Sequence, residues 1–467
     1  MRTRRFSILP LLAVCSLGLA ACGTTHAGTT HAAITHAAIT HVATATAGNS
    51  PGPSHSQLLP GCGSPVPPRH AWATEVSVNG HVRWQVPLPT FGNDPQTEPS
   101  PVIVGNIALF AQDGVVHALQ LADGHQLWSW VGSQGDQGGD GVYGMWPWHG
   151  TVAVLTDQVS THARLTGLDA ATGRVVWTVR LPGRGLYGNL TATADGGLAM
   201  VGTNDKLQTV DIQTGRTRWT QPAAAPRGPV AIGGTVIVGA GGSLIGYDDR
   251  SGQVRWTRTG VPEDSVLQIL AGLVLVTSGT QGPSDPTALT AVDPATGQVA
   301  WRFDPRTPVT VLGAGPAGLA VTTYFDRKLY LIDPATGRVR WHAATFIAQD
   351  TLPLVTATDI YSLEGGAVDY PTSRITDRAA ANGALRWVRS LSTQAFGPQP
   401  VLAVGRQAVV QTSSTRPGRP APLLAFQAAS GQLAWHVEMP TLVQVPPLML
   451  PSSLLIQAAD PGYACPA

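Results

Sequence analysis

Nine regularly spaced pairs, each a glycine followed four residues later by a tryptophan, recur in this chain of 467 residues, and no other feature limits the fold as strongly. Successive pairs are separated by 37 to 49 residues, which is the period of architectures that repeat one supersecondary unit. Nine of the 13 tryptophans occupy this one position. The pairs are Gly80/Trp84, Gly124/Trp128, Gly173/Trp177, Gly215/Trp219, Gly252/Trp256, Gly297/Trp301, Gly337/Trp341, Gly383/Trp387 and Gly431/Trp435.

Each copy of the repeat predicts two strands joined by a tight turn. In residues 329–341, which read LYLIDPATGRVRW, a short apolar run precedes the turn. Asp333 can accept hydrogen bonds from the backbone of the turn, Pro334 fixes φ, and Gly337 adopts a positive φ without steric cost. Five turns keep both the acidic residue and the glycine: Asp169/Gly173, Asp211/Gly215, Asp248/Gly252, Asp293/Gly297 and Asp333/Gly337.

Two further apolar runs precede each turn, so that one period contains four short strands. In one unit the four runs are 228–232, 235–239, 243–247 and 253–256. No stretch from Gln57 onward has a sustained apolar stripe with the 3.6-residue period of a helix. The sequence therefore predicts an all-β chain, and four antiparallel strands per repeat favour a β-propeller over the alternative, a solenoid.

The repeat leaves two blade counts open. Nine tryptophan motifs bound eight complete four-stranded units. Two strands expected near 443–450 and 453–458, and two near 72–78 and 81–86, would form a composite blade from both termini that closes the ring. The literal count is then nine, whereas eight is the more common number for a repeat of this kind.

The pattern Asp-x-x-Thr-Gly-x-x-x-Trp resembles the tryptophan-docking repeat of PQQ-type, quinoprotein-like β-propellers. The resemblance implies that each tryptophan docks structurally between adjacent blades. It is weaker where the acidic position holds Gln120, Ala379 or Gln427. The repeat and the segment 444–458 also resemble the BamB-like propeller lipoproteins, which implies a scaffold class.

The first 21 residues predict a lipoprotein signal peptide. Three arginines precede an apolar stretch that is too short for a transmembrane helix. The stretch ends in Leu19-Ala-Ala-Cys22, which resembles a bacterial lipobox. This resemblance implies cleavage before Cys22, a lipid on its sulfur, and anchoring to the extracytoplasmic face of the cell membrane. Ordinary cleavage with a free Cys22 is the alternative.

Residues 22–61 predict a disordered tether, and residues 62–467 the propeller. The tether is rich in Thr, Ala, His and Pro, a composition that cannot bury an apolar core. Its histidines recur every five residues, which leaves metal binding open as an alternative, and glycosylation is open as well.

Two cysteines, Cys62 and Cys465, flank the propeller, and in an exported protein such an isolated pair predicts a disulfide. The two ends of a ring are neighbours, so the pairing agrees with the fold. The net charge of +1 gives no basic field, which argues against nucleic acid as a partner.

The sequence assigns no catalytic residue, no metal and no cofactor. Residues 313–318, GAGPAG, match the dinucleotide fingerprint, but strand-like residues follow where the motif needs a helix, so the match is read as coincidence. The quinoprotein enzymes would show adjacent cysteines, and these are absent. Asp136 and Asp140 leave a weak Ca²⁺ site open in a glycine-rich loop. PQQ and Ca²⁺ belong to the alternative of a PQQ-dependent or sugar-linked oxidoreductase.

The longer connections predict where function resides. They fall at 87–98, 131–141 and 388–398 between blades, and at 156–164, 278–287, 364–373 and 412–421 between second and third strands. In a propeller both kinds lie on one face, opposite the Asp-x-x-Thr-Gly turns, and long loops commonly bind ligands. Tyr143, Trp146, Trp148 and His149 are the candidate contact residues there, with a role in the inner-strand core as the alternative.

The resulting prediction is a non-catalytic, membrane-anchored platform that binds an envelope protein or ligand whose identity the sequence does not give. The oxidoreductase above is one alternative. Binding of an envelope polysaccharide through the aromatic residues is another.

Overall fold

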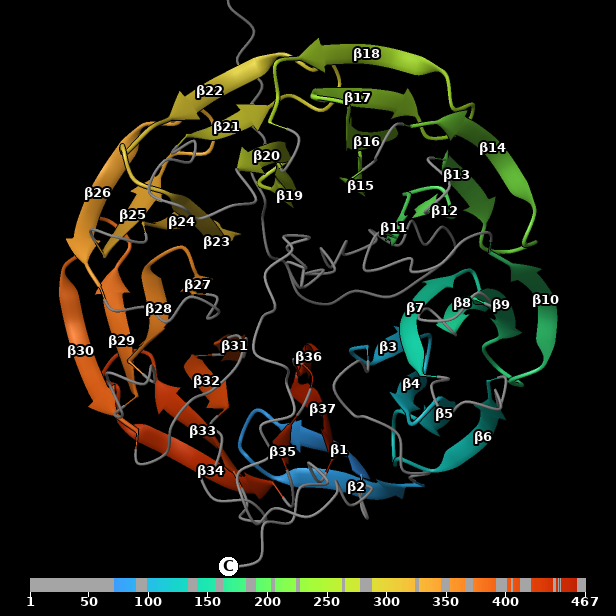
Figure 1. Ribbon diagram of the computed structural model, residues 1–467. Helices are drawn as coiled ribbons and strands as arrows, with labels where there is room; N and C mark the ends of the chain where they lie inside the picture. Colours follow the sequence, from blue (N-terminus) through green and yellow to red (C-terminus); the bar gives the residue numbers. More distant parts are fainter. Residues whose placement is uncertain are drawn as a thin grey trace, which may run out of the picture. The chain divides into compact units, whose positions relative to one another are not determined.

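Nine sheets follow one another around a ring in the computed structural model (Figure 1). Every regular element is a β-strand in the part of the chain that the structure describes. That part comprises residues 71–89, 99–132, 141–156, 163–181, 190–202, 206–223, 227–262, 265–277, 288–323, 327–345, 353–365, 373–391, 401–404, 406–411, 421–439, 442–443, 445 and 447–459. It lies within one unit, Ile39–Ala467.

Eight blades are built from four consecutive antiparallel strands each. Blades 1 to 4 contain β3 (Val102–Val104), β4 (Ile107–Gln112), β5 (Val115–Gln120) and β6 (Gln126–Val131); β7 (Val142–Trp148), β8 (Thr151–Thr156), β9 (Arg164–Asp169) and β10 (Val175–Arg180); β11 (Leu190–Ala192), β12 (Gly197–Gly202), β13 (Lys206–Asp211) and β14 (Thr217–Pro222); and β15 (Arg227–Ile232), β16 (Thr235–Ala240), β17 (Ser243–Asp248) and β18 (Val254–Thr259).

Blades 5 to 8 repeat this arrangement. They contain β19 (Val266–Leu270), β20 (Leu273–Thr277), β21 (Leu289–Val292) and β22 (Val299–Phe303); β23 (Val309–Gly315), β24 (Gly318–Thr323), β25 (Lys328–Ile332) and β26 (Val339–Ala344); β27 (Leu354–Val355), β28 (Asp359–Glu364), β29 (Arg374–Ala379) and β30 (Leu385–Ser390); and β31 (Leu402–Val404), β32 (Gln407–Gln411), β33 (Ala421–Gln427) and β34 (Leu433–Met439). In each blade the first strand lies nearest the centre and the fourth runs along the circumference (Figure 1).

The ninth blade joins the two ends of the chain. Its order is β2 (Val82–Leu88), β1 (Ala71–Ser77), β37 (Ser453–Ala459) and β35 (Leu442–Val443), and β36 (Leu448–Met449) also pairs with β37. Strands β1 and β37 are antiparallel in register from Ala71 opposite Ala459 to Ser77 opposite Ser453. The composite blade is therefore confirmed, and of the two blade counts nine is the one the fold adopts.

The core lies between blades. Alternate residues of a strand point to opposite faces of its sheet. In blade 1, Leu109 and Val116 pack toward blade 2, whereas Phe110 and Leu119 pack toward the composite blade. Because both faces of a blade are covered, its middle strands are apolar at nearly every position, which is why they appeared as apolar runs in the sequence.

The dinucleotide-like glycines form a β-hairpin. Residues 309–315 are strand β23 and residues 318–323 are β24, so no helix follows the glycines. A side chain on Gly315 would collide with the backbone carbonyl of Val355 in β27. The glycines therefore permit close approach between the first strands of blades 6 and 7, and the coincidence inferred from the sequence is confirmed.

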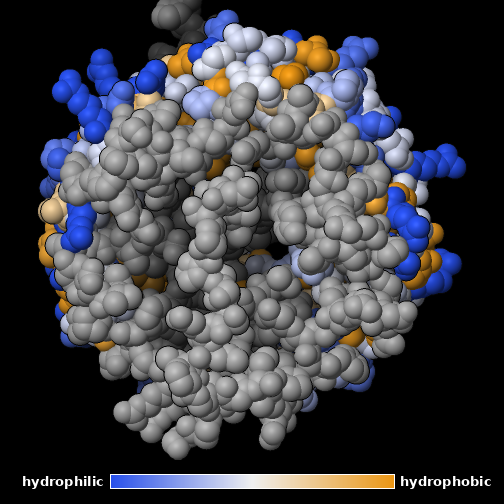
Figure 2. All heavy atoms as spheres, in the orientation of Figure 1, coloured by the Kyte–Doolittle hydropathy of each residue, from blue (hydrophilic) through white to orange (hydrophobic). Residues whose placement is uncertain are grey.

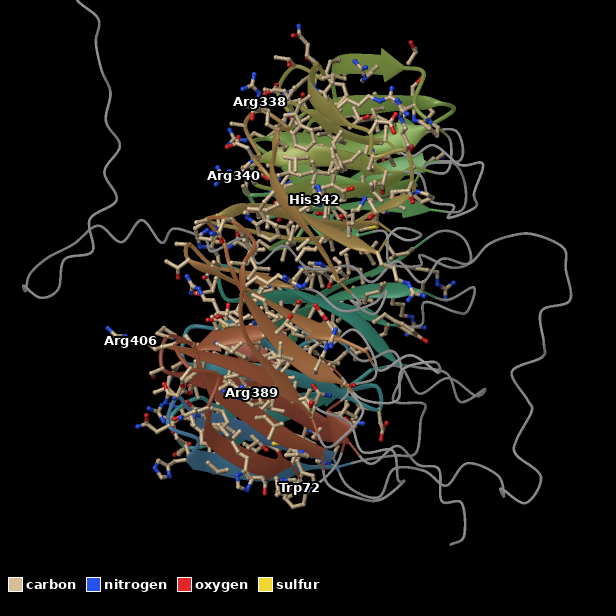
Figure 3. The ribbon with its side chains drawn as sticks, turned by 90° about the vertical axis from the view of Figure 1, so that its left-hand side faces the viewer. Trp72, Arg338, Arg340, His342, Arg389 and Arg406 are labelled. Atoms are coloured by element: carbon tan, nitrogen blue, oxygen red, sulfur yellow. The ribbon has the colours of Figure 1, made fainter. Side chains whose placement is uncertain are left out.

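The ring has two faces. Hydrogen bonds join the connection between the first and second strands to the turn between the third and fourth, as from the Ala170 amide to the Gly150 carbonyl at 2.8 Å. We call the face that carries both connections the turn face, and Arg338 and Arg406 lie on it (Figure 3). The opposite face, on which the other two kinds of connection begin and end, is the loop face.

The circumference is mainly hydrophilic, with single hydrophobic residues among the charged ones (Figure 2). Several of these exposed residues, such as Val254, Val339 and Leu433, begin an outermost strand. No helix in the described part of the chain is long and apolar enough to cross a membrane.

Candidate functional site

Each repeat tryptophan hydrogen-bonds to the turn of the following blade. The indole Nε1–H donates to a backbone carbonyl there, at 2.7 to 3.1 Å. The nine donor and acceptor residues are Trp84 and Leu121, Trp128 and Ala170, Trp177 and Ile212, Trp219 and Asp249, Trp256 and Pro294, Trp301 and Pro334, Trp341 and Ala380, Trp387 and Ala428, and Trp435 and Val78.

The same indole lies flat against the repeat glycine of that following turn. A Cβ on Gly337 would lie 2.7 Å from the Trp301 ring, and a Cβ on Gly383 would lie 2.6 Å from the Trp341 ring. Both glycines have a positive φ, 70° and 74°. The glycine and the tryptophan of one repeat therefore lie in two different interfaces. The glycine contacts the tryptophan of the preceding blade, and the tryptophan contacts the glycine of the following blade.

This contact also closes the ring. Trp435 of β34 donates to the Val78 carbonyl at 2.9 Å and to Gln407 Oε1 at 2.7 Å, and it covers Gly80. Val78 and Gly80 belong to the turn between β1 and β2. Residues more than 350 positions apart thus make the contact that neighbouring repeats make elsewhere.

The five acidic turn residues bind the backbone and hydroxyl of their own turns. Asp293 Oδ1 accepts hydrogen bonds from the Thr296 amide at 2.8 Å and from the Thr296 hydroxyl at 2.7 Å. Asp169, Asp211, Asp248 and Asp333 have equivalent contacts. The hydrogen bond from the Thr296 hydroxyl lowers the pKa of Asp293, so this carboxylate is ionised at neutral pH.

Arginines immediately before the docking tryptophan tie the two turn-face connections of a blade together. Arg255 bonds Thr235 Oγ1 at 2.8 Å and Asp248 Oδ2 at 2.6 Å, and Arg340 bonds the Ala317 carbonyl at 2.7 Å and Asp333 Oδ2 at 2.6 Å. The sequence reasoning missed these residues. The recurring Arg-Trp dipeptide would have revealed them: it occurs at 83–84, 218–219, 255–256, 340–341 and 386–387.

The four candidate contact residues in β7 and directly after it are separated by the fold. Tyr143 lies near the loop-face end of this strand, whereas Trp148 and His149 lie at its turn-face end, beside the Gly150 carbonyl that bonds the β9–β10 turn. The expectation that all four share the long-loop face is therefore wrong for Trp148 and His149, because one strand carries the chain from one face to the other.

Three of these four residues pack inside the ring. Tyr143, Trp146 and Trp148 are half-buried against the core between blades 2 and 3, and Trp148 lies on Gly196 of blade 3. His149 is exposed and meets Trp148 edge-on, with ring centroids 4.7 Å apart. The three aromatic residues therefore belong to the core formed by the inner strands, which was the alternative left open by the sequence.

Among the residues that the structure describes, two buried ionisable side chains have no hydrogen-bond partner for any of their polar atoms. Asp377 in β29 is fully buried, and this burial raises the pKa of its carboxyl to about 7. Burial lowers the pKa of His117 in β5 to about 4, so the imidazole is neutral at neutral pH. By contrast, the buried Glu364 accepts hydrogen bonds from Thr345 of blade 6 and from Arg374 of its own blade, at 2.9 and 2.7 Å.

The remaining candidates lie outside the described residues. These are Cys22, Cys62, Cys465, Asp136, Asp140, the signal peptide, the tether and most of the long connections. The strand ends that flank those connections lie at the loop face, as in the hydrogen bond from the Leu391 amide to the Ser373 carbonyl. Within the described ranges, no group of three or more His, Cys, Asp or Glu side chains is placed to hold a metal ion.

Nine antiparallel blades, each joined to the next by a tryptophan that docks on its turn, define a PQQ-type β-propeller. The family model described as outer membrane protein assembly factor BamB matches residues 112–280 and 285–444, which is more than half of the chain. The chain belongs to this family.

Comparison with solved structures finds similarity at low sequence identity. A eukaryotic initiation factor is 13% identical with a TM-score of 0.55, covering 83% of this chain and 98% of its own. BamB from Moraxella catarrhalis is 18% identical with a TM-score of 0.39, covering 68% and 90%. A quinohemoprotein alcohol dehydrogenase from Pseudomonas putida HK5 is 12% identical with a TM-score of 0.43, covering 82% and 76%. Among curated proteins, none matches the sequence.

Proposed function

We propose that the protein is a non-catalytic scaffold of the cell envelope, anchored to the extracytoplasmic face of the membrane by a lipid on Cys22. Its propeller binds a partner protein through the loop face. Membership of the BamB family supports a scaffold role. The lipobox-like Leu19–Cys22 segment supports the anchor, and a disulfide between Cys62 and Cys465 is proposed to secure the two ends of the ring.

The observation that carries the choice of face is the use of polar side chains on the turn face. Arg218 bonds Asp195 and Asp211, both at 2.8 Å, and Arg255 and Arg340 bond their own turns in the same way. These charges are engaged in holding the blades. The long connections, which the repeat does not constrain, begin and end on the loop face and are free to differ from blade to blade.

Cross-linking in intact cells tests the choice of face. The protein carries a photo-reactive residue at one position at a time, either in the 412–421 connection or at Arg338 on the turn face. We expect cross-links to a partner from the first position and none from the second. The reverse pattern would place the functional surface on the turn face. Because the net charge is only +1, cross-linking should depend little on salt.

The anchor and the catalytic alternative have separate tests. Mass spectrometry of the mature N-terminal peptide should find acylated Cys22, and a Cys22→Ala protein should leave the membrane fraction. Reduction of a dye with alcohols or sugars after addition of PQQ and Ca²⁺ should not exceed the buffer control. Activity that depends on added PQQ would replace the scaffold by the oxidoreductase alternative.

A further inference from the structure

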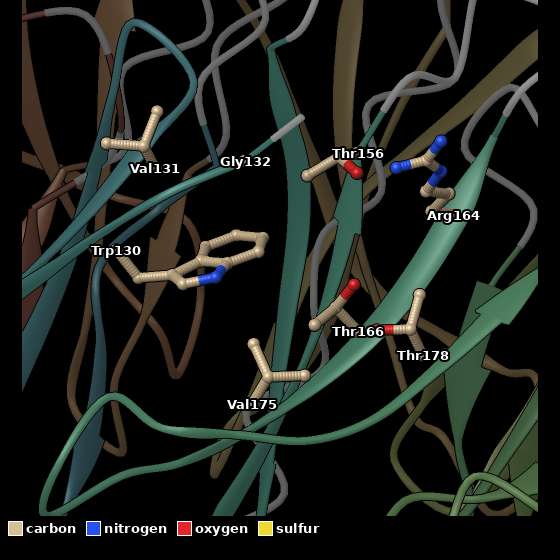
Figure 4. Close-up of a pocket in the computed structure, with 8 residues that line it drawn as sticks. All are labelled: Trp130, Val131, Gly132, Thr156, Arg164, Thr166, Val175 and Thr178. Carbon is tan, nitrogen blue, oxygen red and sulfur yellow. The ribbon is translucent and has the colours of Figure 1, made fainter. Parts of the chain in front are cut away.

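An open groove of about 170 Å³ lies between the outer parts of blades 1 and 2 (Figure 4). Its walls come from the end of β6 on one side and from β8, β9 and β10 on the other. Pockets for drug-sized ligands are about 300–1,000 Å³. This groove is therefore large enough for one ring-sized group rather than for an extended molecule.

A second tryptophan forms one wall of the groove. Trp130 follows the docking Trp128 by two residues, so both indoles leave β6 on the side that faces blade 2. Trp128 donates its N–H to Ala170, whereas the N–H of Trp130 has no acceptor among the described residues. Trp130 therefore offers the groove an apolar ring face and one hydrogen-bond donor.

Three threonines form the opposite wall. Thr156, Thr166 and Thr178 line the groove from three adjacent strands, and Figure 4 shows them across from the indole of Trp130. Thr166 and Thr178 are direct register partners in β9 and β10, so their side chains stand side by side. Within the described part of the chain, none of the three hydroxyls forms a hydrogen bond in a turn or between blades.

Two arginines give this wall a positive charge. Arg164 lines the groove at its loop-face end, and Arg180 lies directly opposite it across the β9–β10 pair. Neither guanidinium has an ion pair within the part of the chain that the structure describes. Like charges directly opposite each other destabilise a sheet. An anion bound beside Arg164 would relieve that repulsion.

We propose that this groove binds one pyranose ring that carries a carboxylate, such as a uronic acid residue of a surface polysaccharide. The apolar C–H face of the sugar packs on the indole of Trp130. Sugar hydroxyls hydrogen-bond to the threonine wall, and Arg164 bonds the carboxylate through its planar fork of N–H donors. The exposed side chains of Val131 and Val175 flank the opening, so a sugar chain along the wall can insert one residue. The inference goes beyond the scaffold function and does not rest on it.

Isothermal titration calorimetry with the purified full chain tests the site. The probes are D-glucuronate and its neutral counterpart D-glucose, each at low ionic strength. We expect D-glucuronate to bind at least about tenfold more tightly than D-glucose, the factor that corresponds to about 1.4 kcal/mol. Arg164→Gln should reduce D-glucuronate affinity by about tenfold or more, to that of D-glucose. Trp130→Ala should weaken both sugars.

Controls separate lost binding from lost folding. Trp130→Phe retains an aromatic face and should recover most of the affinity, while thermal melts verify that each variant is folded. Arg258→Gln changes a half-buried arginine of outer strand β18 in another blade, and this variant should bind D-glucuronate like the wild type. The proposal is overturned if D-glucuronate fails to bind at millimolar concentration, if Arg164→Gln and Arg258→Gln behave alike, or if D-glucose binds equally well. Binding only of short peptides would make the groove a protein contact instead.

Discussion

Blades 6 and 7 have the same docking geometry but different turn chemistry. In blade 6, Asp333 accepts hydrogen bonds from its turn and from Arg340. In blade 7, Ala379 occupies the acidic position. Even so, the amide of the turn glycine bonds the carbonyl four residues earlier at 2.8 Å in both blades. The docking tryptophans, Trp301 and Trp341, donate to the two turns at the same distance, 2.7 Å.

The difference between these blades shows which residues of the motif determine the docking contact. Blade 7 supplies its carboxylate from another strand, because Arg386 pairs with Asp359 at the start of β28. Arg386 thereby bonds the start of the second strand, beside the connection between the first and second strands of blade 7. The acidic residue is therefore one of several ways to hold the arginine, whereas the glycine and the tryptophan are kept in both blades.

The largest expected effect is loss of a docking indole. Trp301→Ala and Trp341→Ala should each lower the free energy of unfolding by about 3–5 kcal/mol, because both remove an aromatic side chain buried between blades. Urea denaturation measures the two values. If the acidic residue Asp333 contributed to docking, Trp301→Ala would lower the free energy of unfolding clearly more than Trp341→Ala. That result would contradict the conclusion that the glycine and the tryptophan determine the contact.

The next effect concerns the glycines that receive these indoles. Gly337→Ala and Gly383→Ala should each cost about 2–4 kcal/mol, since the new methyl group meets a tryptophan ring and the residue must keep a positive φ. The matched control is Gly105→Ala, whose φ of 61° is also positive but which has no atom within 4 Å of an added Cβ. Equal losses at all three positions would show that backbone strain alone explains the glycines.

A buried carboxyl distinguishes blade 7 in its dependence on pH. Asp377 and Leu331 of blade 6 occupy matching positions, each opposite its docking tryptophan. The pKa of Asp377 is raised to about 7, so the folded state holds a proton that the unfolded state loses near its ordinary value. Its stabilising contribution is therefore complete at low pH and is lost as pH rises toward 7.

Asp377→Asn removes this titration. Relative to the variant, the wild type should lose about 2 kcal/mol between about pH 5.5 and pH 7, at about 1.4 kcal/mol per pH unit. Denaturation curves at several pH values give the difference. A difference that does not change with pH, or one that grows in favour of the wild type, would mean that the Asp377 pKa is not raised.

The smallest effect is expected at the acidic turn residue itself. Asp333→Asn should lower Tm by less than either glycine variant, because Arg340 keeps its bond to the Ala317 carbonyl. Ala379→Asp, which gives blade 7 the usual residue, should raise Tm slightly or leave it unchanged. A fall in Tm for Asp333→Asn as large as that of Gly337→Ala would restore the acidic residue as a determinant of the turn.

The sequence predicted the ring because its strongest signals are local. The glycine and tryptophan of each repeat, the turn residues and the apolar runs are all read within one unit, and they gave the strands and the composite blade. What the sequence could not show is which blade each tryptophan contacts. That partner lies 30 to 42 residues farther along in eight cases and at the other end of the chain for Trp435.

The candidate binding residues show the same limit. Trp146 and Trp148 were candidate contact residues because they lie near the long connection 131–141, yet their neighbours are supplied by blade 3. Asp377 gave no signal in its own strand, since only packing between blades 7 and 8 encloses it. The groove beside Trp130 likewise requires residues of two blades.

Native-state hydrogen exchange tests most directly whether one repeated contact closes the whole ring. The amides of β1 and β37 in the composite blade should be protected as strongly as those of β24 and β25 in blade 6, because the Trp435 contact at Gly80 equals the others. Gly80→Ala should then lower protection in all four strands together. If β1 and β37 exchange much faster than blade 6 in the wild type, or if Gly80→Ala affects them alone, the ring is not closed by this contact.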